Sequence, residues 1–158
     1  MANHRQLLEE FAARAKTSSR VEQLMEQIGE RLHEEIARYN WVGFYLRDKS
    51  DPNTLVLGPF TGSFSPHERI SIDVGLCGAA VTSASTVVVN DVAEDIRYLP
   101  GSEIVKSEIV VPVFALRNVV AVMDINSYFA GTFTPEERSF VEGCAGIVGK
   151  YMEGQKSN

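Results

Sequence analysis

The stretch SEIVVPVFALRNVVAVMDIN, residues 107–126, decides the fold of this chain. Two apolar segments rich in valine and isoleucine flank Arg117-Asn118, a spacing that suits a tight hairpin between antiparallel strands. Both segments are apolar enough to lie in the interior of a sheet. Asp124 is charged within such a segment, which is costly unless it has a partner or faces a cavity; a capping role at the strand end is the alternative. Pairing of the strands would bring Glu108 towards the same end of the sheet.

Upstream of the hairpin the pattern predicts further strands, separated by turn-rich pieces. These extended segments are WVGFYLRD (41–48), TLVLGPF (54–60), HERISID (67–73) and TVVV (86–89). Trp41 and Tyr45 are four residues apart on one strand and so point to the same face, either in the core or on the wall of a pocket. Residues 90–106 show no clear periodicity, and loops of that length are often binding loops or lids.

Helices are predicted at both ends of the chain. Apolar residues recur at three- and four-residue spacings in the first forty residues, and Ser19 with Glu22 forms a possible capping box. Thr134 is predicted to cap the last helix, with Pro135 in its first turn. The chain, 1–158, is predicted to be one α+β domain, with N-terminal helices (1–38), a sheet with pocket loops (39–133) and a C-terminal helix (134–154).

Composition narrows the class of partner. The net charge is −6, with the acidic residues spread along the chain, which argues against a nucleic-acid surface. The most apolar stretch is too short to span a bilayer, so no membrane contact is expected. The chain has two cysteines, and its N-terminal sequence has no apolar signal core, so we expect a cytoplasmic protein.

Cys77 is the main candidate for chemistry. It lies in DVGLCGAAV (73–81), where an extended segment leads into a short helix. It is either a thiol activated at a helix N-terminus or a small residue lining a pocket, and no basic residue lies within several positions to lower its pKa. His67, ten residues earlier, reaches the same place if the strand between folds back. Cys144 lies on the apolar stripe of the last helix, where a cysteine is usually inert.

Common cofactor motifs are not found in this sequence. It contains no phosphate-binding glycine loop, no paired cysteines at zinc spacing and no HExxH helix. The three histidines, at positions 4, 33 and 67, are too widely separated to suggest a metal site on their own. We therefore predict neither a metal nor a cofactor.

From about residue 38 onwards the chain contains, in order, the motifs NWVGFYL, LVLGPFTG, ERISIDVGLCGAAV, VVVNDV, KSEIVVPVF, VVAVMDINS and FTPEERSFVE. Together these motifs resemble the GAF domain family and, within it, the free methionine-(R)-sulfoxide reductases. The resemblance implies a central antiparallel sheet, with the terminal helices packed on one face and the ligand-pocket loops on the other. It also implies a homodimer.

In the reductases that this chain resembles, a cysteine thiolate attacks the sulfur of free methionine sulfoxide and methionine leaves. A second cysteine resolves the sulfenic acid, and thioredoxin reduces the product. The resemblance places Trp41, Tyr45, Glu108 and Asp124 at pocket positions, and Cys77 at the cysteine of the family's G-x-C-G motif.

Other positions depart from the family pattern. Gly101 stands at the position of the principal nucleophile, His67 at that of the resolving cysteine, and Asn126 at that of an aspartate. We therefore predict a binding module for a small, amino-acid-like molecule such as methionine sulfoxide or methionine, without the usual redox cycle. The predicted ligand-binding residues are Trp41, Tyr45, His67, Glu108, Asp124 and Asn126.

Two alternatives stay open. The chain could be a divergent reductase in which Cys77 is the catalytic residue and an external thiol resolves it; thioredoxin is a partner only in that case. A third hypothesis is a regulatory partner of another protein, using the dimer surface and the loop at 90–106.

Overall fold

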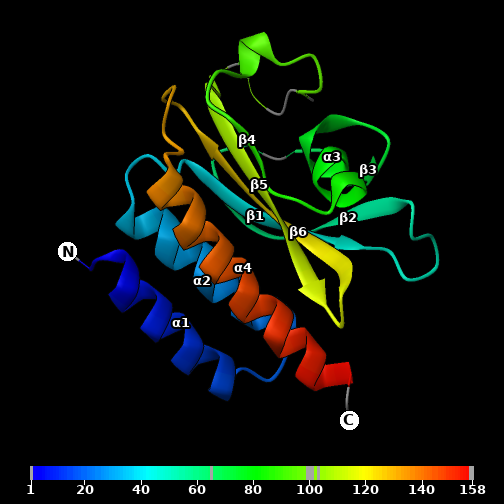
Figure 1. The fold of residues 1–158 in the computed structure, drawn as a ribbon. Helices are drawn as coiled ribbons and strands as arrows, with labels where there is room; N and C mark the ends of the chain where they lie inside the picture. The colour runs from blue at the N-terminus through cyan, green and yellow to red at the C-terminus, as the bar shows by residue number, and fades with distance from the viewer. Residues whose placement is uncertain (1, 65, 99–101, 103, 157–158) are drawn as a thin grey trace.

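A six-stranded antiparallel sheet with helices on both faces forms the protein in the computed structural model, which describes residues 2–64, 66–98, 102 and 104–156 (Figure 1). The elements are α1 (His4–Thr17), α2 (Val21–Glu35), β1 (Trp41–Arg47), β2 (Thr54–Gly62), β3 (Arg69–Ser71), α3 (Gly75–Ser83), β4 (Val87–Val89), the 3₁₀ helix η1 (Val92–Glu94), β5 (Ser107–Ala115), β6 (Asn118–Ser127) and α4 (Pro135–Lys156). The strand order is β3-β2-β1-β6-β5-β4. The predicted α+β class is confirmed.

Strands β5 and β6 form the predicted hairpin, and each has a neighbour on both sides, as its apolar sequence indicates. The turn lies one residue earlier than predicted. Ala115 pairs with Asn118, so Leu116 and Arg117 are the turn residues, with φ of 51° and 71°. Two positive φ values are typical of the type I′ turn, whose twist matches that of the flanking strands.

Side chains on the hairpin alternate between two hydrophobic cores, as the two-residue period of a strand requires. Val111 and Met123, which are paired partners, face the helical layer formed by α1, α2 and α4. Val110 and Val122 belong to the second core, on the opposite face of the sheet. Asp124 lies on this same second face because it is two residues from Val122.

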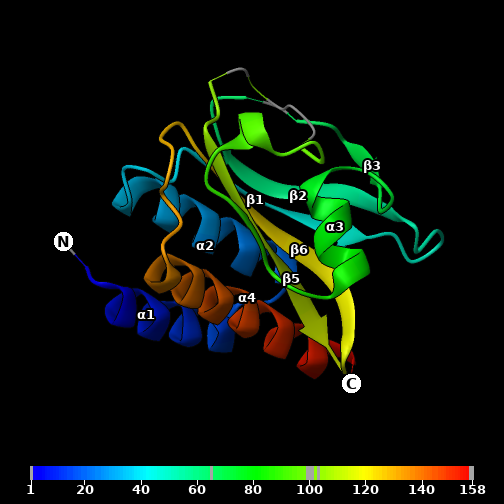
Figure 2. The same cartoon turned by 45° about the horizontal axis from the view of Figure 1, so that its top comes forward.

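The terminal helices lie together on one face of the sheet, with α2 and α4 nearer to the strands and α1 outside them (Figures 1 and 2). At the start of α4 the Thr134 hydroxyl accepts a hydrogen bond from the backbone N–H of Glu137 at 3.3 Å, as predicted. The predicted capping box of Ser19 and Glu22 is wrong. The Ser19 N–H and hydroxyl instead donate to Oε1 of Gln23. The reason is that the N-cap is Arg20, one residue later than predicted, so the third residue after the cap is Gln23 rather than Glu22.

The opposite face of the sheet is covered by α3 (Figure 2), and β3 and β4 form the two edges of the sheet. This arrangement agrees with the expectation of helices on one face and pocket elements on the other. Among the described residues, no helix is both long enough and apolar enough to cross a membrane.

Candidate functional site

Two glycines place Cys77 at the sheet. Gly75 opens α3 with φ of 74°, a conformation that favours glycine. At Gly78 a Cβ atom would lie 2.5 Å from the carbonyl oxygen of Ile72, so only glycine lets the helix pack this closely on the preceding segment. Cys77 is therefore directed from the first turn of α3 towards the sheet, where it is 5% exposed.

A cavity of about 30 Å³ lies between α3 and the second face of the sheet. All seven residues predicted from the sequence line it: Trp41, Tyr45, His67, Cys77, Glu108, Asp124 and Asn126. Five further lining residues had no chemical signal in the sequence, namely Phe64, Pro66, Ile70, Gly75 and Leu76. His67 is exposed and lies at the rim of the cavity, whereas the carboxylates and Cys77 are buried.

An aromatic stack forms one wall of the cavity. The indole of Trp41 stacks with the rings of Phe60 and Phe64, with both centroid distances at 5.5 Å and interplanar angles of 20° and 17°. Its Nε1–H donates a hydrogen bond of 3.0 Å to the carbonyl oxygen of Phe64. Trp41 is 0% exposed, so the orientation of this wall is fixed by packing and by a satisfied donor.

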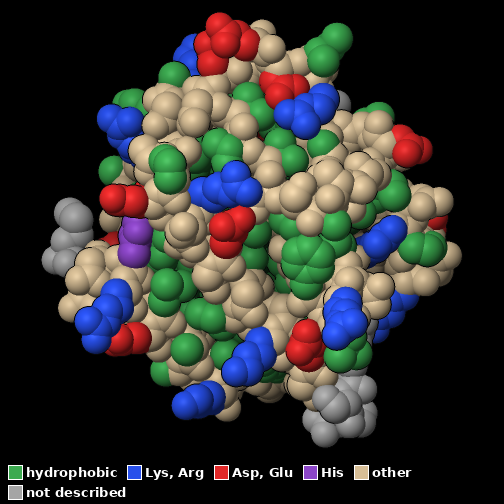
Figure 3. All heavy atoms as spheres, viewed as in Figure 1, with side chains coloured by type: hydrophobic (Ala, Val, Ile, Leu, Met, Phe, Trp, Pro, Cys, Tyr) green, Lys and Arg blue, Asp and Glu red, His purple; other side chains and the backbone are tan. Residues whose placement is uncertain are grey.

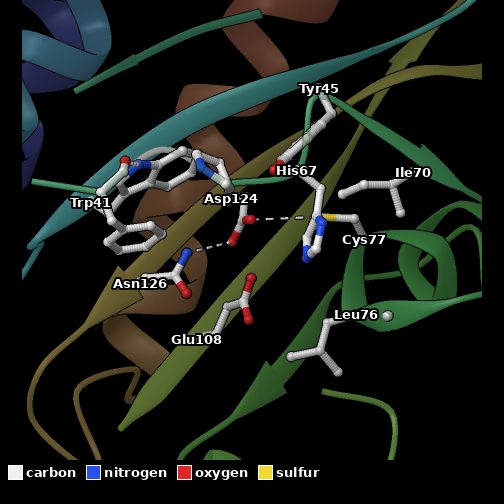
Figure 4. A pocket seen from close by; sticks show the side chains of 12 residues that line it. Trp41, Tyr45, His67, Ile70, Leu76, Cys77, Glu108, Asp124 and Asn126 are labelled. Atoms are coloured by element: carbon white, nitrogen blue, oxygen red, sulfur yellow. Dashed lines mark hydrogen bonds between the residues drawn. The ribbon is translucent and has the colours of Figure 1, made fainter. Parts of the chain in front are cut away.

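Opposite this wall, three acidic groups converge from three different elements (Figure 4). Sγ of Cys77 donates to Oδ2 of Asp124 across 3.5 Å, and Nδ2 of Asn126 donates to Oδ1 of Asp124 at 3.1 Å. Glu108 pairs with Asn126 across the hairpin, which places its side chain on the same face as Asp124. One donor atom from each of Cys77, Glu108 and Asp124 lies within 4.8 Å of the others.

Burial is the main cause of the raised pKa values of Cys77, Glu108 and Asp124. It raises the pKa of the Cys77 thiol well above its usual value, and the charges of Asp124 and Glu108 raise it further. Burial likewise raises the pKa of Glu108, with a further contribution from Asp124, and it raises the pKa of Asp124. No Lys or Arg is present among the described residues that line the cavity. Burial and the nearby carboxyl groups therefore outweigh the lowering of the Cys77 pKa that a helix N-terminus would cause, and the thiol is favoured over the thiolate.

The second cysteine lies far from this cluster. Cys144 is on α4, is 0% exposed and belongs to the core between the sheet and the helical layer, whereas Cys77 belongs to the core on the other face. Both cysteines are free. Since the sheet separates them, the folded chain has no route to an internal disulfide.

Two predictions concern the segment 90–106: that it is a binding loop or lid, and that it holds the position of the family's principal nucleophile. Gly101, the predicted position of the family's principal nucleophile, lies outside the described residues. No described residue of this segment lines the cavity. Its first part is held in place by Asn90, whose side chain hydrogen-bonds both the N–H and the carbonyl of Phe133.

The fold and this pocket define a class of protein. The family model for the GAF domain matches residues 18–153, and the chain therefore belongs to the GAF domain family. Over 112 residues it is 34% identical to the free methionine-R-sulfoxide reductase of Saccharomyces cerevisiae, which covers 70% of this chain and 62% of that protein. Over 106 residues it is 36% identical to the protein of the same name from Escherichia coli, with 67% and 62% covered. The match thus spans less than two thirds of either relative.

Solved structures agree with these relatives. The free methionine-R-sulfoxide reductase of Neisseria meningitidis, in complex with its substrate, has a TM-score of 0.91 and 29% identity, covering 98% of this chain and 90% of that chain. A Staphylococcus aureus structure named fRMsr, also in complex with substrate, has a TM-score of 0.86 and 30% identity, with 96% and 97% covered. This chain is thus a GAF domain of the free methionine-R-sulfoxide reductase family.

Proposed function

We propose that the protein binds a free, amino-acid-like small molecule, methionine sulfoxide or methionine, and does not carry out the usual redox cycle on it. The observation that carries this proposal is the separation of Cys77 from Cys144 by the sheet. A thiol-based cycle needs an ionisable nucleophile and a second thiol to receive the oxidised sulfur. Cys77 has a raised pKa and no partner thiol within the chain.

The pocket has the chemistry to bind an amino acid. Carboxyl groups of Glu108 and Asp124, with no basic side chain among the described lining residues, favour the ammonium group of a free amino acid. The flat indole of Trp41 offers an apolar surface for a thioether chain. A cavity of about 30 Å³ holds only a few water-sized groups, so we expect the wall that includes Phe64 and Pro66 to shift outward when the ligand enters.

Calorimetric titration with L-methionine-(R)-sulfoxide, L-methionine and the N-acetyl derivative of the sulfoxide tests binding. The free amino acids should bind, while the acetylated compound loses a charge-assisted contact of about 1.5–3 kcal/mol, equivalent to about 10- to 150-fold in affinity. Asp124→Asn should weaken binding of the free amino acids, whereas Asp48→Asn, on the surface, is the matched control. Equal affinity for the acetylated and free compounds would refute the proposed ammonium contact.

A second candidate function is a reductase that uses Cys77 with an external thiol. The 3.5 Å contact between Cys77 and Asp124 supports it, because that carboxyl can exchange a proton with a sulfoxide oxygen in the same pocket. In this scheme the Cys77 sulfur attacks the sulfoxide sulfur, and methionine leaves as Cys77 becomes a sulfenic acid. Two external thiols then restore Cys77, yielding one disulfide and one water.

Methionine release from the (R)-sulfoxide in the presence of dithiothreitol distinguishes the two functions. The binding proposal expects no turnover above that of a sample without protein. Catalytic turnover that is lost in Cys77→Ser and kept in Cys144→Ala would establish the reductase instead. In that case thioredoxin should replace dithiothreitol as the reductant.

We further propose that the protein acts as a cytoplasmic homodimer and contacts neither nucleic acid nor membrane. On the face shown in Figure 3, basic and acidic side chains are interspersed rather than gathered by sign, which supports the absence of a nucleic-acid surface there. Light scattering on the purified chain measures the oligomeric state, and a monomer at micromolar concentration would contradict the dimer.

A further inference from the structure

The geometry points to a second kind of guest in this pocket: we propose that Cys77, Glu108 and Asp124 bind a thiophilic divalent cation of the Zn²⁺ class. This goes beyond the proposed amino-acid binding and does not depend on it. The three residues lie on α3, β5 and β6, far apart in the sequence. The sequence therefore shows no pair of ligands at a spacing typical of zinc sites. The fold alone brings them together.

The spacing of the donor atoms fits a tetrahedral ion. With Zn–S near 2.3 Å and Zn–O near 2.1 Å, a tetrahedral angle separates the sulfur and oxygen ligands by about 3.6 Å. The distance between Sγ of Cys77 and Oδ2 of Asp124 is 3.5 Å. The carboxylate of Glu108 completes a set whose members all lie within 4.8 Å of one another, so a shift of about 1 Å brings the third ligand to a bonding distance.

Burial and charge favour an ion of this kind. The three side chains are 5%, 6% and 5% exposed for Cys77, Glu108 and Asp124. Buried acidic groups are normally paired with a cation or bound to a metal, and no Lys or Arg is among the described residues that line this cavity. A cavity of about 30 Å³ admits an ion with a bound water, with little movement of its walls.

The hydroxyl of Tyr45 is an independent observation that points to a ligand at this place. Tyr45 is 2% exposed and lines the cavity, and its oxygen points towards the acidic cluster (Figure 4). Within the described part of the chain this hydroxyl has no hydrogen-bond partner. A hydroxyl that faces such a cavity gains from an acceptor placed there. Water at the open fourth position of a zinc ion would accept its hydrogen bond.

Asn126 acts beside the proposed ligands. Its amide nitrogen donates to Oδ1 of Asp124 and leaves Oδ2 for the ion. Metal-bound carboxylates are commonly held by such a second hydrogen bond. Asn126 is therefore a positioning residue for the site rather than a ligand.

Cobalt titration of the full chain, first freed of metal with a chelator, tests the proposal. Co²⁺ should bind at one equivalent per chain and give the near-ultraviolet charge-transfer band of a thiolate–cobalt bond, and one equivalent of Zn²⁺ should remove that band. Cys77→Ser should abolish the band, whereas the matched cysteine variant Cys144→Ala should keep it. Asp124→Asn should lower Zn²⁺ affinity by more than about tenfold, the loss that even outer residues cause at zinc sites.

Two results would overturn the proposal: wild-type protein that binds no stoichiometric Co²⁺ or Zn²⁺, or a charge-transfer band that persists in Cys77→Ser. The first needs no variant, so a folding defect in a variant leaves the test decisive. A negative metal result leaves amino-acid binding intact, because that function needs only the carboxyl groups and the aromatic wall. Conversely, metal binding without methionine binding would retain the site and reject the proposed function.

Discussion

Gly43→Ala tests whether the position of the Trp41 indole in the pocket wall requires a glycine at residue 43, which leaves space for the ring. A Cβ atom at position 43 would lie 2.3 Å from Cη2 and 2.7 Å from Cζ3 of Trp41, and 2.8 Å from Cβ of Phe60. Because carbon atoms pack at about 3.5–4.0 Å, the indole must move by about 1 Å or more. Overpacking of this kind lowers the free energy of unfolding by about 1–3 kcal/mol, which for a chain of this length corresponds to about 2–12 °C in Tm.

The movement should also reach the pocket. The hydrogen bond between Nε1 of Trp41 and the carbonyl of Phe64 is 3.0 Å long and would be distorted by such a shift. The chain has one tryptophan, so intrinsic fluorescence reports on this ring alone. We expect a shift of its emission in the folded Gly43→Ala protein and a lower affinity for methionine sulfoxide.

Gly146→Ala in α4 is the matched control, since a Cβ there meets no atom within 4 Å. A glycine-to-alanine change in an exposed helix should raise stability by about 0.5–1 kcal/mol. Urea unfolding followed by circular dichroism and fluorescence compares the two variants. If Gly43→Ala unfolds within about 0.5 kcal/mol of the wild type and keeps its emission spectrum, the wall is not fixed in the way that we describe.

Three further predictions address charge, an unpaired donor and the thiols. Arg69 lowers the pKa of Asp48 to about 2, so the stabilising contribution of the Asp48 carboxylate is present above the pKa of the unfolded chain and is lost as the pH falls through about 2. The difference in Tm between wild type and Asp48→Asn at neutral pH should therefore vanish near pH 2, and a constant difference would contradict this. Tyr45→Phe removes a hydroxyl that faces the cavity and has no described partner, so it should leave stability unchanged while weakening methionine sulfoxide binding; a clear loss of stability would reveal a hidden partner. Ellman's reagent should react with neither Cys77 nor Cys144 in the folded protein, because both are buried, and with both in urea; rapid reaction of the native protein would show that one of them is accessible.

The main strands and the pocket face could be predicted because they follow from local periodicity. A strand exposes alternate residues to opposite faces, so the apolar pattern of residues 107–126 fixes which side chains share a face with Asp124. Trp41 and Tyr45 were assigned to one face by the same rule, and both line the cavity. The turn was misplaced because Leu116 and Arg117 are not residues that a type I′ turn normally selects.

The centre of the site could not be predicted from local patterns. Cys77 and Asp124 are 47 residues apart in the chain, and their contact depends on how α3 packs against Ile72 through Gly78. Their sequence neighbours therefore say nothing about the raised pKa of the thiol, which results from burial and from carboxyl groups on other elements. The helix N-terminus, which was visible in the sequence, favours the opposite shift.

The charge of the cavity limits what it can bind. Two carboxyl groups, of Glu108 and Asp124, share a space whose described lining has no Lys or Arg, and both cannot be buried as unpaired anions without a large cost. A guest with one positive charge, such as an amino acid ammonium, compensates one carboxylate and leaves the second carboxyl and the Cys77 thiol protonated. A divalent cation compensates both and draws in the sulfur. Cys77→Ser therefore separates the two guests: it should spare ammonium binding and remove the thiophilic metal.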